Sequence, residues 1–209
     1  MSDIGNQNAI GDLSVSRETL AKLRLLVDLV LKWTRHINLV SVNSINDIWE
    51  RHVLDSSQLF NHLPTGAKTW IDLGSGGGFP GLVVGIIAQE LSPELKVILV
   101  ESDQRKAAFL RAAIRELRLD VGVLTSRIEK IEPLAADVIS ARALGSLSTL
   151  LGYMNRHQNA TGMGLFPKGR AVTPEIAAAR LNWRFDLTAH ASMTDPSAQI
   201  LQIENVFHV

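Results

Sequence analysis

The chain has 209 residues, and its 21 lysine and arginine residues balance 21 aspartate and glutamate residues, so the formal net charge is zero. This length suits one large domain with or without an appendage, and a hydrophobic content of 46% excludes intrinsic disorder. The absence of cysteine excludes disulfides, thiolate metal sites and a cysteine nucleophile.

The first 15 residues are polar and rich in glycine and asparagine, and we expect them to form a flexible tail. They lack the basic and apolar segments of a signal peptide. The longest apolar run, near residues 82–88, is far shorter than the roughly 20 residues of a membrane span. We therefore expect a cytoplasmic protein that does not enter a membrane.

Residues 16–66 are predicted to form a helical extension. Apolar residues recur every three or four positions from Leu20 to Trp33, which predicts a helix that Ser16 can cap. A second helix is expected after Ser44, and the turn sequence LPTG at residues 63–66 ends it. Within this helix, Arg51 and Asp55 have the i,i+4 spacing of a surface ion pair.

Strand-like and helical segments alternate over residues 67–209, which predicts one α/β domain with a mostly parallel sheet. The short, turn-rich link at residues 193–197 favours an antiparallel last strand. The expected strands are Lys68–Leu73, Lys96–Glu101, Val121–Thr125, Asp137–Ala141, Gly162–Pro167, Trp183–Ala189 and Gln199–Val206. The expected helical segments are Phe79–Leu91, residues 103–118, Arg127–Ile131, Ser146–Arg156 and Thr173–Leu181, the last with Pro174 at its first position.

The most informative segment is a glycine loop after the first strand of this domain, DLGSGGGFPG at residues 72–81. Two interpretations compete. Gly76, Gly78 and Gly81 match the dinucleotide pattern G-x-G-x-x-G. With Asp72 and Gly74 included, the loop instead matches the acidic-x-G-x-G-x-G pattern of Rossmann-like methyltransferases that use S-adenosylmethionine.

Two carboxylates bear on this choice. Glu101, at the end of the second strand, fits both interpretations, because an acid there accepts hydrogen bonds from ribose hydroxyls. Asp72 favours the methyltransferase, because a cofactor with a cationic amino-acid end benefits from a carboxylate nearby, whereas a dinucleotide needs none at that position. A third interpretation is a tight turn with a purely structural role, which binds no ligand.

Several further motifs follow one another across about residues 20–170. They are Trp33…Asn38-Leu39, residues 51–56 (RHVLDS), the glycine loop, Glu101-Ser102…Lys106…Phe109-Leu110, residues 126–129 (SRIE), residues 140–143 (SARA) and Lys168-Gly169. Together they resemble one family, the bacterial 16S rRNA guanine-N7 methyltransferases (RsmG, also called GidB). The chain departs from the pattern of this family at residues 166–169 (FPKG) and in the C-terminus, which lacks the family's lysine-rich ending.

The resemblance implies a Rossmann-like class I methyltransferase with a seven-stranded, mostly parallel sheet, an antiparallel last strand and the N-terminal helical extension. It implies methylation by S-adenosylmethionine of N7 of a guanine, guanine-527, in the 530 loop of 16S rRNA. The expected cofactor-binding residues are Asp72, Gly74, Gly76, Gly78, Phe79, Glu101, Ile128, Glu129 and Arg142.

This reaction asks little of acid–base chemistry. N7 of guanine carries a lone pair and no proton, so the enzyme mainly holds it in line with the methyl group. We therefore expect no residue to act as a nucleophile or base, and only Arg142 is a catalytic candidate. The six histidines show no metal-binding spacing, so no metal is expected.

The neutral total charge hides two basic regions. Residues 105–130 hold seven basic and three acidic residues, and residues 142–184 hold six basic and one acidic residue. Arg111 and Arg115 share one helix face, which indicates either phosphate contact or a solvated surface. The expected RNA-binding residues are Arg51, His52, Lys106, Arg111, Arg115, Arg127 and Lys168.

Two other functions stay open at this point. The G-x-G-x-x-G match allows an NAD-dependent oxidoreductase, and the fold also allows a non-catalytic RNA-binding protein. For the methyltransferase, the expected partner is 16S rRNA in the small ribosomal subunit or a precursor of it, and we expect a monomer.

Overall fold

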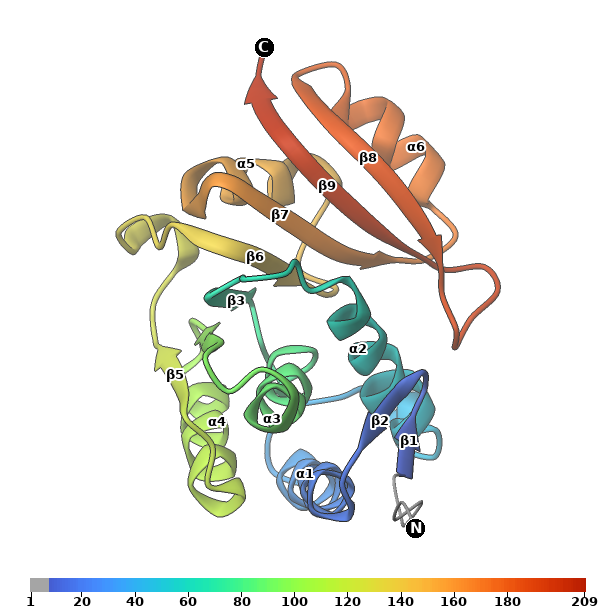
Figure 1. The fold of residues 1–209 in the computed structure, drawn as a ribbon, viewed down its shortest axis with the longest axis vertical. Coiled ribbons are helices and arrows are strands. Elements are labelled where there is room, and N and C mark those ends of the chain that lie inside the picture. The colour runs from blue at the N-terminus through green and yellow to red at the C-terminus, as the bar shows by residue number, and fades with distance from the viewer. Residues whose placement is uncertain (1–7) are drawn as a thin grey trace, which may run out of the picture.

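The computed structural model describes residues 8–209, which form a seven-stranded sheet covered by helices on both faces (Figure 1). The strand order is β5-β4-β3-β6-β7-β9-β8. β9 runs antiparallel to β7 and β8, and the remaining neighbours are parallel, so the predicted antiparallel last strand is confirmed. The strands are β3 (Thr69–Leu73), β4 (Lys96–Val100), β5 (Val121–Leu124), β6 (Ala136–Ala141), β7 (Gln158–Lys168), β8 (Trp183–Ala191) and β9 (Gln199–His208).

Alternating side chains of the central strands supply both faces of the core. Trp70 of β3 packs into the cluster with α3 (Gly81–Leu91) and α4 (Gln104–Leu117). Its neighbour Ile71 packs into the other cluster, with α5 (Leu147–His157) and α6 (Val172–Ala179). Because both faces are covered, these strands are apolar on both sides, as in other parallel sheets.

α1 (Arg17–Thr34) forms an outer layer against α3 and α4. Ser16 caps it as predicted, with its hydroxyl oxygen accepting from the Thr19 N–H. At the other end of the helix, the Trp33 ring meets Phe109 of α4 edge-on, with 5.6 Å between ring centroids. The extension is thereby joined to the sheet domain through α4.

The second predicted helix of the extension is broken into short pieces, so this prediction was only partly right. They are η1 (Val42–Ser44), the π-helical η2 (Trp49–Leu54), α2 (Asp55–Ser57) and η3 (Gln58–His62). Side chains compete for the backbone acceptors, because Ser57 Oγ donates to the Leu54 carbonyl and Gln58 Nε2 to the Asp55 carbonyl. The π-helical winding also removes the i,i+4 stacking that an Arg51–Asp55 pair needs, and Asp55 instead pairs with Arg142.

The predicted flexible tail is wrong for residues 8–15, whereas residues 1–7 lie outside the described part of the chain. β1 (Asn8–Ile10) and β2 (Leu13–Val15) form an antiparallel hairpin. Ile10 and Val15 are buried in the cluster that contains α1 and α3. Burial of these two apolar side chains orders a segment whose composition is otherwise that of a loop. A smaller difference is that α6 begins at Val172, which places Pro174 third in the helix.

A buried polar network joins β3 to β6 at the centre of the sheet. Trp70 Nε1 donates to Ser140 Oγ at 2.9 Å, and Ser140 Oγ donates to Asp72 Oδ1 at 2.7 Å. All three side chains are fully buried. Each polar atom in such a network needs its partner, because no water replaces a lost hydrogen bond.

We predict that Ser140→Ala lowers the free energy of unfolding by about 2–4 kcal/mol, because it leaves the Trp70 indole without an acceptor and Asp72 without one donor. Urea unfolding of wild type and variant measures this change. Ser148→Ala, at a partly exposed position of α5, is the control and should change stability by less than about 0.5 kcal/mol. An equally small effect of Ser140→Ala would contradict the prediction.

Candidate active site

The glycine loop leaves β3 and turns sharply beneath the following helix. The Gly74 and Ser75 N–H groups donate to the Val100 carbonyl at 2.8 and 3.1 Å, which ties the start of the loop to β4. Gly74 and Gly78 have positive φ angles of 67° and 88°. A Cβ at Gly74 would lie 2.5 Å from Leu144 Cδ1, and one at Gly78 would overlap Leu82, so both positions require glycine.

Asp72 lies inside the protein, under this loop. Its Oδ2 accepts from the Gly81 N–H at 3.2 Å, at the start of α3, and its Oδ1 accepts from Ser140. Burial raises the pKa of Asp72 to about 6, although the hydrogen bonds from Ser140, Ser75 and Gly81 oppose this shift. With no exposed surface, the carboxylate braces the loop and does not present itself to a ligand.

Glu101 holds the other side of the loop. Its Oε2 accepts from the Gly76 N–H and its Oε1 from the Asp103 N–H, both at 2.8 Å. The carboxylate therefore fixes the glycine loop relative to the end of β4. Unlike Asp72, Glu101 lines a cavity.

The glycine-loop cavity, of about 260 Å³, lies at the carboxyl ends of β3, β4 and β5. Of the residues predicted to bind a cofactor, it contains Gly74, Gly76, Glu101, Ile128 and Glu129, and it also contains Lys106 and Arg127, which were predicted for RNA. Asp72, Gly78, Phe79 and Arg142 do not line it. The cavity is also lined by residues for which the sequence predicts no cofactor contact, namely Ser102, Ser126, Ala143, Leu144 and Tyr153.

Tyr153 is the most informative addition, and it is the only tyrosine of the chain. Its hydroxyl, from α5, donates to Glu129 Oε1 at 2.5 Å. This hydrogen bond lowers the pKa of Glu129 and raises the pKa of Tyr153. No local motif marks Tyr153, because its role depends on α5 packing beside η4 (Ile128–Lys130), 24 residues earlier in the chain.

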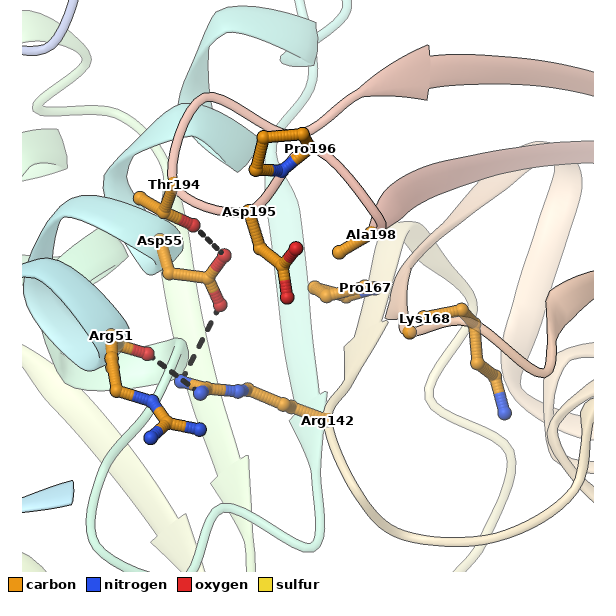
Figure 2. A pocket seen from close by; sticks show the side chains of 10 residues that line it. Arg51, Asp55, Arg142, Pro167, Lys168, Thr194, Asp195, Pro196 and Ala198 are labelled. Carbon is orange, nitrogen blue, oxygen red and sulfur yellow. Dashed lines mark hydrogen bonds and ion pairs between the residues drawn. The ribbon is translucent and has the colours of Figure 1, made fainter. Parts of the chain in front are cut away.

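A second, cationic cavity of about 370 Å³ lies between the helical extension, the ends of β6 and β7, and the loop from β8 to β9 (Figure 2). We call it the arginine cavity. It is lined by Arg51, Asp55, Arg142, Pro167, Lys168, Gly169, Thr194, Asp195, Pro196 and Ala198.

An adjoining hollow of about 490 Å³ shares lining residues with both cavities. It shares Arg142, Pro167, Lys168 and Gly169 with the arginine cavity. It shares Ala143 and Leu144 with the glycine-loop cavity. Residues of the turn after β6 therefore line both sites.

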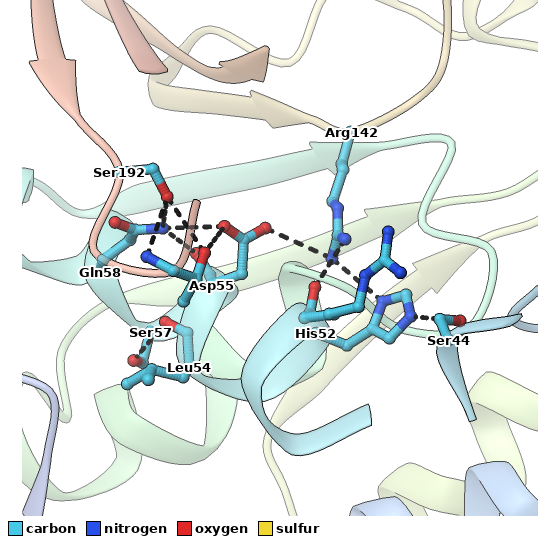
Figure 3. Close-up of polar contacts among 10 residues, drawn as sticks. Ser44, His52, Leu54, Asp55, Ser57, Gln58, Arg142 and Ser192 are labelled. Carbon is cyan, nitrogen blue, oxygen red and sulfur yellow. Dashed lines mark hydrogen bonds and ion pairs between the residues drawn. The ribbon is translucent and has the colours of Figure 1, made fainter. Parts of the chain in front are cut away.

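Arg142 is held from the helical extension (Figure 3). Its Nη1 donates to His52 Nδ1 at 3.1 Å and lies 3.5 Å from Asp55 Oδ2, and its Nη2 donates to the Arg51 carbonyl at 2.6 Å. Burial lowers the pKa of Arg142, and Arg51 adds to this shift, whereas Asp55 opposes it. The end of β6 and the helical extension therefore meet at this guanidinium group.

His52 has both ring nitrogens engaged within the protein. Nδ1 accepts from Arg142, so Nε2 carries the proton and donates to Ser44 Oγ at 2.9 Å. The ring also packs against Phe79, with 4.9 Å between centroids. Burial, and then Arg142 and Arg51, lower the pKa of His52 to about 4. His52 is thus a neutral support for Arg142, with no free nitrogen for a phosphate.

The remaining predicted RNA contacts divide between the arginine cavity and the outer surface. Lys168 Nζ lies 2.7 Å from Glu175 Oε2 and 2.9 Å from the Gly145 carbonyl oxygen, so its charge is neutralised internally. Arg111 and Arg115 are exposed on α4, away from both cavities, and Arg111 Nη2 donates to Thr125 Oγ1 at 2.6 Å. The exposed arginine face was predicted from the helical spacing.

Residues 8–209 show neither a cluster of metal ligands nor a membrane-spanning helix. This part of the chain contains no group of three or more histidine, aspartate or glutamate side chains placed to hold a metal ion. None of its helices has the length and apolar character that a membrane crossing requires.

Sequence comparisons show which known proteins this chain is similar to. The family model described as rRNA small subunit methyltransferase G (GidB) matches residues 19–203. A protein named Ribosomal RNA small subunit methyltransferase G from Cereibacter sphaeroides is 50% identical over 203 residues, covering 97% of this chain and 98% of that protein. One of the same name from Ruegeria pomeroyi is 50% identical over 197 residues, covering 94% and 96%.

Solved structures support the fold at low sequence identity. A SAM-dependent methyltransferase from Aquifex aeolicus superposes with a TM-score of 0.56 at 14% identity, covering 77% of this chain and 92% of that one. A variant of MtNAS in complex with S-adenosylmethionine gives 0.56 at 15% identity, covering 90% and 72%. At these identities the likeness establishes the fold alone.

The neutral state of His52 predicts a pH dependence of stability. The pKa of His52 falls from 6.5 to about 4 on folding, so its stabilisation is complete above pH 6.5 and is lost as the pH falls through about 4. In His52→Asn, the Asn Oδ1 can still accept from Arg142 but does not titrate. The difference in unfolding free energy between wild type and variant should therefore shrink between pH 7 and pH 4.

Urea unfolding at intervals across this range measures that difference. Asn155→Ala, at an exposed position of α5 that carries no titratable group, is the control and should keep a constant offset from wild type. A pH-independent difference for His52→Asn would show that His52 does not titrate as described.

Proposed function

The chain belongs to the rRNA small subunit methyltransferase G family, and on that premise we propose that it transfers a methyl group from S-adenosylmethionine to N7 of a guanine in the 530 loop of 16S rRNA. The observation that carries this proposal is the meeting of two cavities at the turn after β6. Ala143 and Leu144 border both the glycine-loop cavity and the hollow beside Arg142 and Lys168. S-adenosylmethionine in the glycine-loop cavity and a guanine in the hollow would meet beside this turn.

The residues of the glycine-loop cavity fit S-adenosylmethionine, which supplies an electrophilic methyl group when bound. Glu101 offers carboxylate oxygens that ribose hydroxyls can reach, and Gly74 and Gly76 let a ligand approach the backbone closely. Ile128 offers an apolar surface to the adenine ring, and Glu129 an acceptor for its amino group. Three other predicted residues do not line this cavity, and we assign them to the shape of the glycine loop instead of to cofactor contact: Asp72, Gly78 and Phe79.

The proposed acceptor needs no base, and the possible bases beside Arg142, which are His52 and Asp55, have their ring nitrogens and carboxylate oxygens engaged within the protein. His52 is neutral, with both nitrogens bonded, and Arg142 is a cation. Because N7 carries a lone pair and no proton, the residues need only orient the guanine and exclude water. The rate should therefore depend on the alignment of the base more than on the protonation of any side chain.

For the RNA, we propose that Arg51 and Arg142 bind the nucleotide at the arginine cavity, that Lys168 borders this cavity while paired with Glu175, and that Arg111 and Arg115 contact phosphates further away. The local excess of positive charge at these places supports this assignment. We assign Lys106 and Arg127 to the border of the cofactor instead, and His52 to the support of Arg142. We further propose that the substrate is the small ribosomal subunit or its precursor, and that the enzyme acts as a cytoplasmic monomer.

The direct test is methyl transfer from labelled S-adenosylmethionine to 30S subunits of a strain that lacks this enzyme, followed by mapping of the modified guanine. Subunits from a strain that has the enzyme should accept no label, because their target is already methylated. No incorporation into 16S rRNA would contradict the proposal. RNA binding without methyl transfer would instead indicate a non-catalytic protein, and thermal stabilisation by NAD(H) alone would indicate an oxidoreductase.

Removal of the Tyr153 hydroxyl should weaken cofactor binding. In Tyr153→Phe, Glu129 loses its hydrogen-bond donor and can turn away from the adenine. We expect about 3- to 10-fold weaker binding of S-adenosylmethionine, as for one hydrogen bond to a partly exposed group. Calorimetric titration measures this affinity, with Asn155→Ala, an exposed position of the same helix, as the control. An unchanged affinity would remove Tyr153 from the cofactor site.

The arginine face of α4 should act through electrostatics alone. Arg111→Ala and Arg115→Ala should each weaken RNA binding and lower the slope of log affinity against log salt by about one per lost phosphate contact. Cofactor affinity should not change. Arg24→Ala removes the same charge from an exposed position of α1 and should leave the slope unaltered. If cofactor affinity falls in either α4 variant, the assignment of this face is wrong.

A further inference from the structure

The orientation of Arg142 is set by groups outside its own domain. Asp55, His52 and the Arg51 carbonyl all belong to the helical extension, about 90 residues earlier in the chain. His52 and Asp55 contact Nη1 of Arg142, and the Arg51 carbonyl accepts from Nη2. In the described part of the chain, no protein group accepts from Nε. The extension therefore holds the Nη1 and Nη2 atoms of the guanidinium group.

Asp55 is the anionic member of this set, and both of its carboxylate oxygens are engaged. Oδ2 faces Arg142, while Oδ1 accepts from Gln58 Nε2 and Thr194 Oγ1, both at 2.9 Å. The Asp55 side chain is 13% exposed and that of Arg142 23% exposed. Interactions between such sheltered charges are screened less than those at the surface. Gln58 and Thr194 therefore hold the Asp55 carboxylate in place independently of Arg142.

Thr194 connects this pair to the loop between β8 and β9. The same loop is held by Gln58, whose Oε1 accepts from the Met193 N–H at 2.9 Å and whose Nε2 donates to Ser192 Oγ at 3.3 Å. Figure 2 shows the loop facing Arg142 across the arginine cavity, with Asp55 between them. Asp55 is thus the point where the extension, the loop and Arg142 meet.

We propose that Asp55 is a positioning residue, which orients the Arg142 guanidinium toward the arginine cavity and is itself held in place by Gln58 and Thr194. The helical extension then has a defined part in the reaction, because without it Arg142 keeps its charge but loses its direction. This proposal rests on the proposed function for its activity measurement. It concerns the geometry of Arg142 and does not depend on which ligand that residue contacts.

The test is a double-mutant cycle with Asp55→Asn and Arg142→Ala. Asn is close to Asp in shape and keeps an oxygen for Gln58 and Thr194, but it presents no charge to Arg142. We expect Asp55→Asn to lower kcat/KM for methyl transfer about 10- to 100-fold, mainly through kcat, and to cause no further loss in the Arg142→Ala background. Single-turnover assays allow the slow variants to be followed.

Two further variants make the test specific. Thr194→Val removes only the outer donor to Asp55 and should cause a smaller loss, which should also vanish in the Arg142→Ala background. Glu50→Gln removes an exposed carboxylate of the same helical segment and should leave kcat/KM unchanged. Equal losses from Asp55→Asn in the wild-type and Arg142→Ala backgrounds would overturn the proposal.

A measurement without substrate keeps the proposal separate from the proposed function. The guanidinium ¹⁵N and ¹H signals of Arg142, assigned from their absence in Arg142→Ala, should show restricted rotation in wild type and faster rotation in Asp55→Asn, in which only His52 and the Arg51 carbonyl still hold the group. Unrestricted rotation in wild type would overturn the positioning role. If wild type shows this restriction but transfers no methyl group to 16S rRNA, the proposed function fails and the positioning role stands.

Discussion

The site depends on one buried carboxylate. Asp72 has no exposed surface, yet it receives hydrogen bonds from Ser140 of β6 and from the Gly81 N–H at the start of α3. Its neighbourhood is held by Trp70 through Ser140. A buried acceptor with directed donors is costly to disturb, so it fixes the relative positions of β3, β6 and the glycine loop. The glycine loop then lines one cavity of the site, and Arg142, which directly follows β6, lines the other.

The two cavities differ in how the chain builds them. Consecutive strand-to-helix turns of one domain form the glycine-loop cavity, as is usual for α/β sheets. The arginine cavity is assembled from distant segments, with Asp55 from the extension, Arg142 after β6 and Thr194 from the β8–β9 loop. Because N7 of guanine needs orientation rather than deprotonation, an assembly that fixes an arginine from several sides suits the proposed reaction.

Predictions from the sequence succeeded where a signal is local and periodic. The strands and helices of the sheet domain, the Ser16 cap and the exposed arginines of α4 follow from apolar spacing and capping chemistry, which neighbouring residues determine. The predictions failed for residues 8–15 and for the second helix of the extension. There, burial of Ile10 and Val15 and side-chain hydrogen bonds such as that from Gln58 override local propensity.

The sequence by itself determined the fold class, the glycine loop and the family, because these depend on residue types at fixed short spacings. It also indicated Glu101 and Glu129 as cavity residues. Only the tertiary structure decided that Asp72 is enclosed, that Asp55 pairs with Arg142 and not Arg51, and that Tyr153 meets Glu129. These contacts join residues far apart in the chain, and their geometry depends on how the helices pack on the sheet, which no local pattern records.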